Sequence, residues 1–253
     1  MDKKQDELKH NYGLVGKDIS YSFSRAYFEE KFENENLECT YFNFDIAHIS
    51  DFEGIIKKTK NLKGLNVTIP YKEAVISKLD KINKRAAKIG AVNTIKITMK
   101  NKLIGYNTDY YGFKKSLLPL LEKHHNNALI FGTGGASKAI AHVFKNLGIR
   151  YNFVSRLVNQ KATYTYSQLT KEIIHHHKIL VNCTPLGTYP NIDECPNIPY
   201  DAIEKDHLLY DLVYNPETTK FLYQGQKNGA KTINGRQMLI HQAEKSWKIW
   251  QND

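Results

Sequence analysis

The glycine-rich segment Gly132 to Ser137 is the first part of the chain whose residue types could do chemistry. It stands between a short apolar run, Ala128 to Phe131, and a stretch with helical spacing, which is the context of a dinucleotide site. Gly132 would permit the tight turn, and Gly134 would let the backbone approach a pyrophosphate at the helix N-terminus. Ser137, in place of the usual third glycine, still allows close helix–strand packing. The segment predicts a dinucleotide site, and a glycine-rich turn without a ligand is the alternative.

The residues after the next apolar run favour one dinucleotide over another. Tyr151 to Val154 is followed by Ser155 and Arg156, with no acid at this strand end. An NAD site usually places Asp or Glu here to accept the ribose hydroxyls, whereas the planar guanidinium of arginine suits a 2′-phosphate. The pattern predicts NADP, and an ordinary surface arginine is the alternative.

Polar residues in the first half of the chain could bind a small substrate. Ser22 and Ser24 lie two apart in an expected extended loop and could hold one carboxylate, although Ser24 could also cap the following helix. Asn66 and Thr68 alternate along an expected strand that ends at a proline. Lys72 would begin the next helix, beside positive backbone charge, where a lysine can take part in proton transfer. A solvated lysine is the alternative.

The elements that must position these residues follow two patterns. In the first half, strands are predicted at Tyr12–Gly16, Cys39–Phe44 and Gly64–Ile69, helices at Ser24–Asn34 and Tyr71–Leu79, and a hairpin at Ala91–Tyr106 turning at Lys100-Asn101. In the second half, strands are predicted at Ala128–Phe131, Tyr151–Val154, Ile179–Cys183, Leu208–Val213 and Lys231–Ile233. A helix ending at Gly148 follows the glycine-rich segment, and a last helix covers Gln237–Trp250. This alternation is typical of a doubly wound α/β sheet, with a boundary between the halves near Asp109 to Pro119.

Composition excludes several classes of function. The 36 Lys and Arg residues among 26 acids give a net charge of +10, but they form no single tract, so a nucleic-acid interface is not expected. No apolar run approaches the roughly 20 residues of a membrane helix, and the charged start MDKKQDELKH lacks the apolar part of a secretory signal. Three cysteines without a zinc-like spacing predict free thiols in a reducing cytoplasm. His175 to His177 cannot all face one ion on regular structure, so no metal is expected there.

Taken together and in order, these segments resemble the motifs of the shikimate dehydrogenase family over nearly the whole chain. The matches are SxS at Ser22 and Ser24, NVTxPxK at Asn66–Lys72, GAVNT at Gly90–Thr94, GxNTDxxG at Gly105–Gly112, the glycine-rich loop at Gly132–Ser137, NATPxG at Asn182–Gly187, DxxY at Asp211–Tyr214, and GxxMLxxQA at Gly235–Ala243. Either GAVNT or GYNTD alone would be interpreted as a turn with a polar residue.

The resemblance implies an α/β fold of two domains. Residues 1–109, completed by the C-terminal helix 236–253, would form an α/β substrate-binding and catalytic domain. Residues 110–235 would form a Rossmann-like, doubly wound NADP-binding domain. The implied activity is the NADP-dependent, reversible reduction of 3-dehydroshikimate to shikimate on the way to chorismate and the aromatic amino acids, by a monomer or homodimer.

The resemblance also implies roles by position. Lys72 and Asp109 would form the catalytic pair, in which Lys72 gives a proton and positive charge to the developing alkoxide and Asp109 orients Lys72. The substrate would be bound by Ser22, Ser24, Asn66, Thr68, Asn93, Tyr214 and Gln242. NADP would be bound by Gly132, Thr133, Gly134, Gly135, Ala136, Ser137, Ser155, Arg156, Thr184, Leu212 and Gly235. No metal is implied.

The chain departs from the family pattern at four positions, one of which is Cys183 in place of the usual Ala. Tyr21 replaces the usual His and Arg25 the usual Pro of the first motif, which puts the shape of the substrate entrance in question. Thr188 replaces the usual Met and bears on nicotinamide packing. Three alternatives stay open: a quinate/shikimate dehydrogenase using NAD, an NADP-binding regulatory protein without catalysis, and another two-domain enzyme such as a methylenetetrahydrofolate dehydrogenase.

Overall fold

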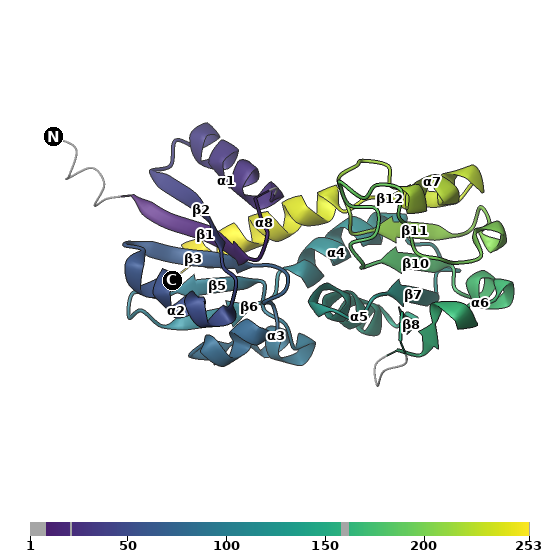
Figure 1. Cartoon of the computed structure of the whole chain (residues 1–253), viewed down its shortest axis with the longest axis horizontal. Helices are drawn as coiled ribbons and strands as arrows, with labels where there is room; N and C mark the ends of the chain where they lie inside the picture. Colours follow the sequence, from purple (N-terminus) through teal and green to yellow (C-terminus); the bar gives the residue numbers. More distant parts are fainter. Residues whose placement is uncertain (1–8, 21, 158–161, 253) are drawn as a thin grey trace. The chain divides into compact units, whose positions relative to one another are not determined.

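The chain divides into two compact units, each with its own sheet (Figure 1). The computed structural model describes residues 9–20, 22–157 and 162–252. The first unit contains the described residues up to Thr108 and those from Gln242 onwards, and the second unit runs from Asp109 to His241. The units therefore divide directly before Asp109, at the start of a helix.

The first unit has a six-stranded sheet in the order β2-β1-β3-β5-β6-β4. Strands β1, β2 and β3 are parallel, and β5 runs antiparallel to both β3 and β6. The elements are β1 His10–Gly16, α1 Phe23–Asn34, β2 Cys39–Asp45, α2 Phe52–Lys58, β3 Leu62–Val67, the 3₁₀ helix η2 Ala74–Lys78, β4 Lys81–Ile82, α3 Lys84–Ile89, β5 Thr94–Ile97 and β6 Leu103–Tyr106.

Both faces of this sheet are covered, because apolar residues alternate along its strands. Tyr12 and Leu14 of β1 pack with α1 and with α8 (Arg236–Gln251), whereas Val15 belongs to the core beneath α2 and η2. Gly64 of β3 allows the close approach of α8, since a Cβ there would lie 2.3 Å from the indole Nε1 of Trp250. The face that carries Tyr12 is therefore the one on which α8 supplies its side chains.

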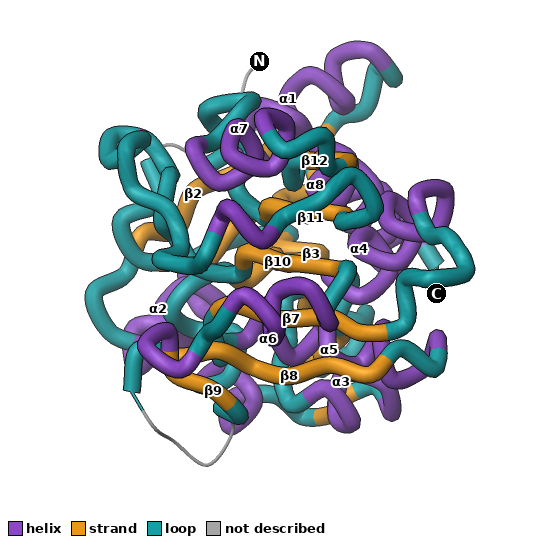
Figure 2. The backbone as a smooth tube through the Cα atoms, turned by 90° about the vertical axis from the view of Figure 1, so that its right-hand side faces the viewer, coloured by secondary structure: helices purple, strands orange, loops and turns teal. Residues whose placement is uncertain are grey.

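The second unit is a parallel sheet in the order β12-β11-β10-β7-β8-β9, which can be followed in Figure 2. Its elements are α4 Asp109–Leu117, β7 Asn127–Phe131, α5 Gly135–Leu147, β8 Arg150–Ser155, β9 Tyr164–Thr165, α6 Lys171–His176, β10 Ile179–Asn182, β11 Leu208–Asp211, α7 Lys220–Lys227 and β12 Lys231–Ile233. Phe113 of α4 packs on Phe144 of α5 and on Tyr210 of β11, whereas Ile174 of α6 and Phe221 of α7 belong to another core. The predicted doubly wound α/β architecture is confirmed.

Most predicted elements are present, with bounds that differ by at most three residues. The hairpin of β5 and β6 and the left-handed cap at Gly148, with φ 72°, are confirmed. The helix predicted over Tyr71–Leu79 is wrong, because only the five-residue η2 forms there. The predicted strand Gly64–Ile69 ends at Val67, and the short helices α2, α3, α6 and α7 were not predicted. Among the described residues, no helix is long and apolar enough to cross a membrane.

Candidate functional site

The two amino-terminal serines have different roles from those predicted by their spacing. Ser22, with extended backbone, is the N-cap of α1, and its Oγ accepts a hydrogen bond of 3.2 Å from the backbone N of Ser24. The prediction that Ser24 caps the helix is wrong, and so is the shared extended loop, because α1 begins at Phe23 and contains Ser24. Ser24 is buried. Tyr21 lies outside the described residues, and Arg25 pairs at 2.8 Å with Glu29 on the exposed side of α1.

Lys72 lies in a turn and not at a helix start. Its backbone carbonyl accepts a 2.7 Å hydrogen bond from the backbone N of Val92, which is a tertiary bond and not one within a helix. This bond ties the NVTIPYK segment to the GAVNT segment, and Lys72 is half-buried. Thr68 lies just beyond the end of β3, where its backbone N donates to the carbonyl of Val15 at 2.9 Å. The placement of Lys72 beside a helix N-terminus is therefore corrected, because a tertiary contact takes the carbonyl that a helix would need.

Three carboxamides predicted to bind substrate lie in one buried network. Asn66 accepts from the hydroxyl of Tyr41 at 2.8 Å and donates through Nδ2 to the carbonyl of Asn93 at 3.2 Å. Asn93 Nδ2 donates to Thr108 Oγ1 at 3.0 Å and, at 3.4 Å, to Oε1 of Gln242. Asn93 Oδ1 accepts from the backbone N of Thr108 at 2.6 Å. The network thus brings together residues from β3, from the position directly before β5 and from α8. Asp109 follows Thr108 directly as the first residue of α4.

Three fully buried hydroxyl groups also belong to this network. Thr94, Thr108 and Ser246 are each 0% exposed and lie within hydrogen-bond distance of one another, with Oγ–Oγ distances of 2.8 Å for Thr94–Ser246 and 3.1 Å for the other two pairs. Sequence reasoning missed these hydroxyls and Tyr41. A signal was available for Ser246, which follows Gln242 by four residues and so shares its helix face.

The predicted cofactor loop has the expected local geometry. Gly132 has φ 100°, a conformation that favours glycine, and Gly134 is the N-cap of the 13-residue α5. A Cβ added to Gly134 would meet nothing within 4 Å, so the backbone faces open space there. The first turn of α5 carries no acid, and the hydroxyl of Ser137 donates back to the carbonyl of Gly134 at 2.6 Å. Such a helix N-terminus suits an anionic group such as a pyrophosphate.

The strand ends next to this loop also fit a phosphorylated dinucleotide. Ser155 ends β8, and the exposed Arg156 follows, with no acid between them and the end of the described segment at Leu157. Gly235 lies so close to the neighbouring strand end that an added Cβ would be 2.1 Å from the carbonyl oxygen of Leu212. The residues present therefore fit NADP, because a guanidinium such as that of Arg156 suits its additional phosphate.

A buried carboxylate joins the ends of β10 and β11. Asp211 accepts hydrogen bonds from Asn182 Nδ2 at 2.9 Å, from the backbone N of Val213 at 3.0 Å and from Thr219 Oγ1 at 2.6 Å. Burial raises the pKa of Asp211 to about 7, against the opposing effect of these three donors. Asn182 in turn accepts from Thr184 Oγ1 at 2.6 Å, so the carboxylate fixes the loop that carries the predicted cofactor residue Thr184.

Comparison with known proteins assigns the chain to one family. The domain described as "Shikimate dehydrogenase substrate binding domain" matches residues 14–95. A protein named shikimate dehydrogenase (NADP(+)) from Clostridium botulinum is 38% identical over 248 residues, which are 94% of this chain and 95% of that protein. The chain belongs to the shikimate dehydrogenase family.

Solved structures of family members agree with this assignment over the whole fold. Shikimate dehydrogenase 1 from Peptoclostridium difficile is 39% identical, with a TM-score of 0.81 over 96% of this chain and 92% of that one. Shikimate 5-dehydrogenase from Thermus thermophilus, solved in complex with NADP(H) and shikimate, is 28% identical, with a TM-score of 0.84 over 96% and 93% of the two chains. The predicted family and its two-sheet α/β fold are confirmed.

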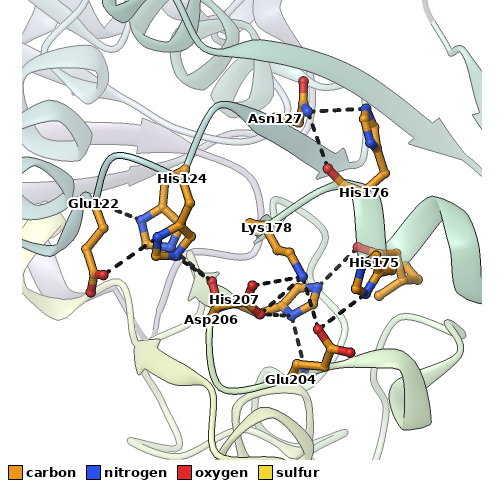
Figure 3. A network of polar contacts seen from close by, with 11 residues as sticks. Glu122, His124, Asn127, His175, His176, Lys178, Glu204, Asp206 and His207 are labelled. Carbon is orange, nitrogen blue, oxygen red and sulfur yellow. Dashed lines mark hydrogen bonds and ion pairs between the residues drawn. The ribbon is translucent and has the colours of Figure 1, made fainter.

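A histidine-rich cluster in this family member resembles a metal site but is arranged as a hydrogen-bond network (Figure 3). Ligand atoms of Glu204, Asp206 and His207 lie within 4.8 Å of one another. However, His207 Nδ1 accepts from the backbone N of Glu204 at 3.0 Å, and its Nε2 donates to the carbonyl of Ile174 at 3.1 Å. Lys178 Nζ contacts both carboxylates at 3.1 Å, so its ammonium group lies where a cation would bind.

The tract His175 to His177 has three different sets of partners. His175 Nδ1 lies 3.2 Å from a carboxylate oxygen of Glu204, and His176 Nε2 lies 3.2 Å from Nδ2 of Asn127 (Figure 3). His177 contacts the carbonyl of Ile173 at 2.6 Å and the side chain of Asn152 at 3.0 Å. The three histidine side chains therefore contact three different parts of the second unit.

Proposed function

We propose that the chain is an NADP-dependent shikimate dehydrogenase, which reversibly reduces 3-dehydroshikimate to shikimate. The observation that carries the proposal is the 38% identity to a shikimate dehydrogenase (NADP(+)) over 94% of the chain. We further assign substrate binding and catalysis to residues 1–109 with the helix 236–253, and NADP binding to residues 110–235. The free cysteines Cys39, Cys183 and Cys195 suit a reducing cytoplasm as the place of action. Assembly as a monomer or a homodimer stays a prediction.

The buried network supports a role of its carboxamides in substrate binding. Gln242 Oε1 accepts from Asn93 and from Thr108, both at 3.4 Å, so its carboxamide belongs to the same network as that of Asn93. Carboxamides held in fixed positions suit the oxygen atoms of a hydroxylated carboxylic acid. Asn66 would support this arrangement from within the network. We assign the remaining substrate contacts to Ser22, Ser24, Thr68 and Tyr214.

We assign proton transfer to Lys72 and its orientation to Asp109. NADPH, when bound, supplies the hydride that adds to the carbonyl carbon of 3-dehydroshikimate. Lys72 would donate a proton to the carbonyl oxygen as negative charge develops there, and its ammonium group would stabilise that charge. In the reverse direction the lysine amine would accept the proton from the shikimate hydroxyl. The backbone bond from Val92 to the Lys72 carbonyl restrains the turn that carries this side chain.

We assign cofactor binding to the residues that surround the α5 N-terminus and the neighbouring strand ends. The pyrophosphate would lie against the loop Gly132–Ser137, and Arg156 would pair with the 2′-phosphate, with Ser155 beside it. Thr184, Leu212 and Gly235 would line the nicotinamide side. Two observations support this assignment: the space in front of Gly134 is open, and the end of β8 carries Ser155 and Arg156 instead of an acid.

The proposal is tested by following NADP reduction at 340 nm with shikimate, and by repeating the assay with NAD and with quinate. We expect turnover with shikimate and NADP. Lys72→Ala should lower kcat by about 10²- to 10⁴-fold, the usual contribution of a general acid or base, while NADP still binds. Lys78→Ala is the matched control, because Lys78 forms an ion pair with Glu53 at 2.9 Å near the surface.

The alternatives give different results in the same assay. Preferential turnover of quinate with NAD would identify the quinate/shikimate dehydrogenase. NADP binding without turnover of any substrate pair would favour the regulatory protein. Equal activity of Lys72→Ala and Lys78→Ala would contradict the role assigned to Lys72.

A further inference from the structure

Ser246 lies on the buried face of α8, one turn after Gln242, and belongs to none of the motifs that indicate the family. We propose that Ser246 is a positioning residue, which fixes the carboxamides that hold the substrate. The proposal rests on the proposed function and deepens it. All of the contacts that carry it lie within the first unit.

The hydrogen-bond capacity of Ser246 is completely used. A serine hydroxyl donates one hydrogen bond and accepts two. Ser246 Oγ donates to the carbonyl of Gln242, one turn back along α8, at 3.0 Å. It can therefore only accept from its other partners. The two nearer ones, Asn66 Nδ2 at 3.0 Å and Thr94 Oγ1 at 2.8 Å, fill its two acceptor positions, and Thr108 Oγ1 lies slightly further away at 3.1 Å. Since its proton is committed, Ser246 dictates that Thr94 donates towards it.

The direction of the Thr94 proton decides how Asn93 is held. With Thr94 donating to Ser246, Asn93 Oδ1 accepts chiefly from the backbone N of Thr108, at 2.6 Å. If Ser246 could not accept, the proton of Thr94 would turn to Asn93 Oδ1, which lies 3.1 Å away. The carboxamide of Asn93 would then be pulled towards Thr94 and away from its bond to Gln242.

Asn66 is fixed by the same hydroxyl from the other side. Tyr41 donates to its Oδ1, and Ser246 accepts from its Nδ2, so the two ends of the carboxamide are held by different elements. The serine thus contacts the carboxamide of Asn66 directly, reaches that of Asn93 through Thr94, and is bonded to the backbone of Gln242. Because it is 0% exposed, it acts on the substrate only through these neighbours.

The test compares Ser246→Ala with the wild type in steady-state kinetics and in calorimetric binding of shikimate. We expect the KM and Kd for shikimate to rise about 5- to 10-fold, the effect of one net hydrogen bond. The KM for NADP should stay within about twofold, because the cofactor residues lie in the second unit. Thr94→Val, which removes the donor without changing the side-chain shape, should reproduce this split, and Thr94→Ser should restore shikimate binding.

A control separates positioning from stability. Tyr12→Phe removes another hydroxyl that binds α8, since Tyr12 accepts from Gln251 Nε2 at 3.2 Å. It should lower stability without changing the KM for shikimate. A KM for shikimate within twofold of the wild type in Ser246→Ala, or an equal rise for Tyr12→Phe, would overturn the proposal. A wild type without shikimate turnover would instead contradict the proposed function, so the two failures are distinguishable.

Discussion

Gly235→Ala should lower the stability of the second unit, because its methyl group would clash with the backbone of Leu212. A Cβ at Gly235 would lie 2.1 Å from the carbonyl oxygen and 2.8 Å from the carbonyl carbon of Leu212. The obstacle is backbone at the end of β11, so no side-chain rotation can relieve it. Gly235 also donates from its backbone N to the carbonyl of Val213 at 3.1 Å, and it accepts from Leu239 in the first turn of α8. The whole segment between β12 and α8 must therefore move.

Overpacking of this kind costs about 1–3 kcal/mol. For a chain of this size, each kcal/mol lowers the Tm by about 2–4 °C, so we expect a loss of about 4–8 °C for a cost near 2 kcal/mol. NADP binding should weaken as well, since Leu212 and Gly235 are assigned to the cofactor site. Thermal unfolding followed by circular dichroism and a fluorescence titration with NADP measure the two effects.

Gly134→Ala is the matched substitution in the same proposed site. Its Cβ would meet nothing within 4 Å, and its backbone, with φ −78° and ψ −172°, is open to alanine. The cost to stability should stay below about 1 kcal/mol, the usual difference between residues at an N-cap. The methyl group would instead enter the space proposed for the pyrophosphate and weaken NADP binding. A Tm of Gly235→Ala within 1 °C of the wild type would refute the contact argument, and unchanged NADP affinity of Gly134→Ala would refute the placement of the pyrophosphate.

Two further predictions concern stability. Burial lowers the pKa of three histidines below the ordinary value of 6.5, namely His125, His177 and His207. The unfolded chain therefore binds protons first at these histidines as the pH falls below about 6.5, and stability should drop by up to about 1.4 kcal/mol per pH unit for each histidine. Asp211, whose pKa is raised to about 7, binds its proton first in the folded chain and offsets part of this loss; a higher urea midpoint at pH 5.5 than at pH 7.5 would contradict the prediction. Trp250→Phe should lower the free energy of unfolding by about 1–3 kcal/mol, because it removes the 3.0 Å bond from the indole to the buried carbonyl of Ile95. Trp247→Phe, measured by the same urea unfolding, controls for the loss of ring area. An equal loss of unfolding free energy in both variants would count against a contribution from the hydrogen bond of Trp250.

The second unit could be predicted well from local patterns. Its strands are short, fully buried apolar runs, and the spacing of apolar residues in α5 marks one helix face directly. Gly148 has the positive φ of a helix C-cap, which is a property of the single residue. Each of these signals lies within a few residues of the element that it predicts, so tertiary contacts were not needed to find them.

The turn at Lys72 shows where such reasoning fails. The spacing from Tyr71 to Leu79 permits a helix, but the Lys72 carbonyl is taken by Val92, 20 residues further along the chain. A β5–β6 hairpin packed beside the turn thus overrides local helical preference. Ser22 gives a second case, since either of two serines could cap a helix and only the helix start at Phe23 decides between them.

The buried network could not be derived from local pattern at all, because its partners are distant in the sequence. Asn66 and Ser246 are 180 residues apart, and Thr108 and Ser246 are 138 apart. Family motifs identified Asn66, Asn93 and Gln242, but they gave no role to Thr94 and Thr108, which they contain, and they do not include Ser246. What the resemblance supplies is a list of substrate residues, and what the structure adds is how these residues are oriented.

One sequence signal does point to this network, and it lies in α8. Gln242, Ser246 and Trp250 follow one another at intervals of four residues, so they share the helix face that packs on the first sheet. Trp250 is the apolar residue expected there, whereas Gln242 and Ser246 interrupt the apolar face. A buried polar side chain costs free energy unless another segment supplies its hydrogen-bond partner. Two such side chains one turn apart, next to a buried tryptophan, therefore indicate that polar groups from the sheet meet the helix at this point, and Asn66, Asn93 and Thr94 are those groups.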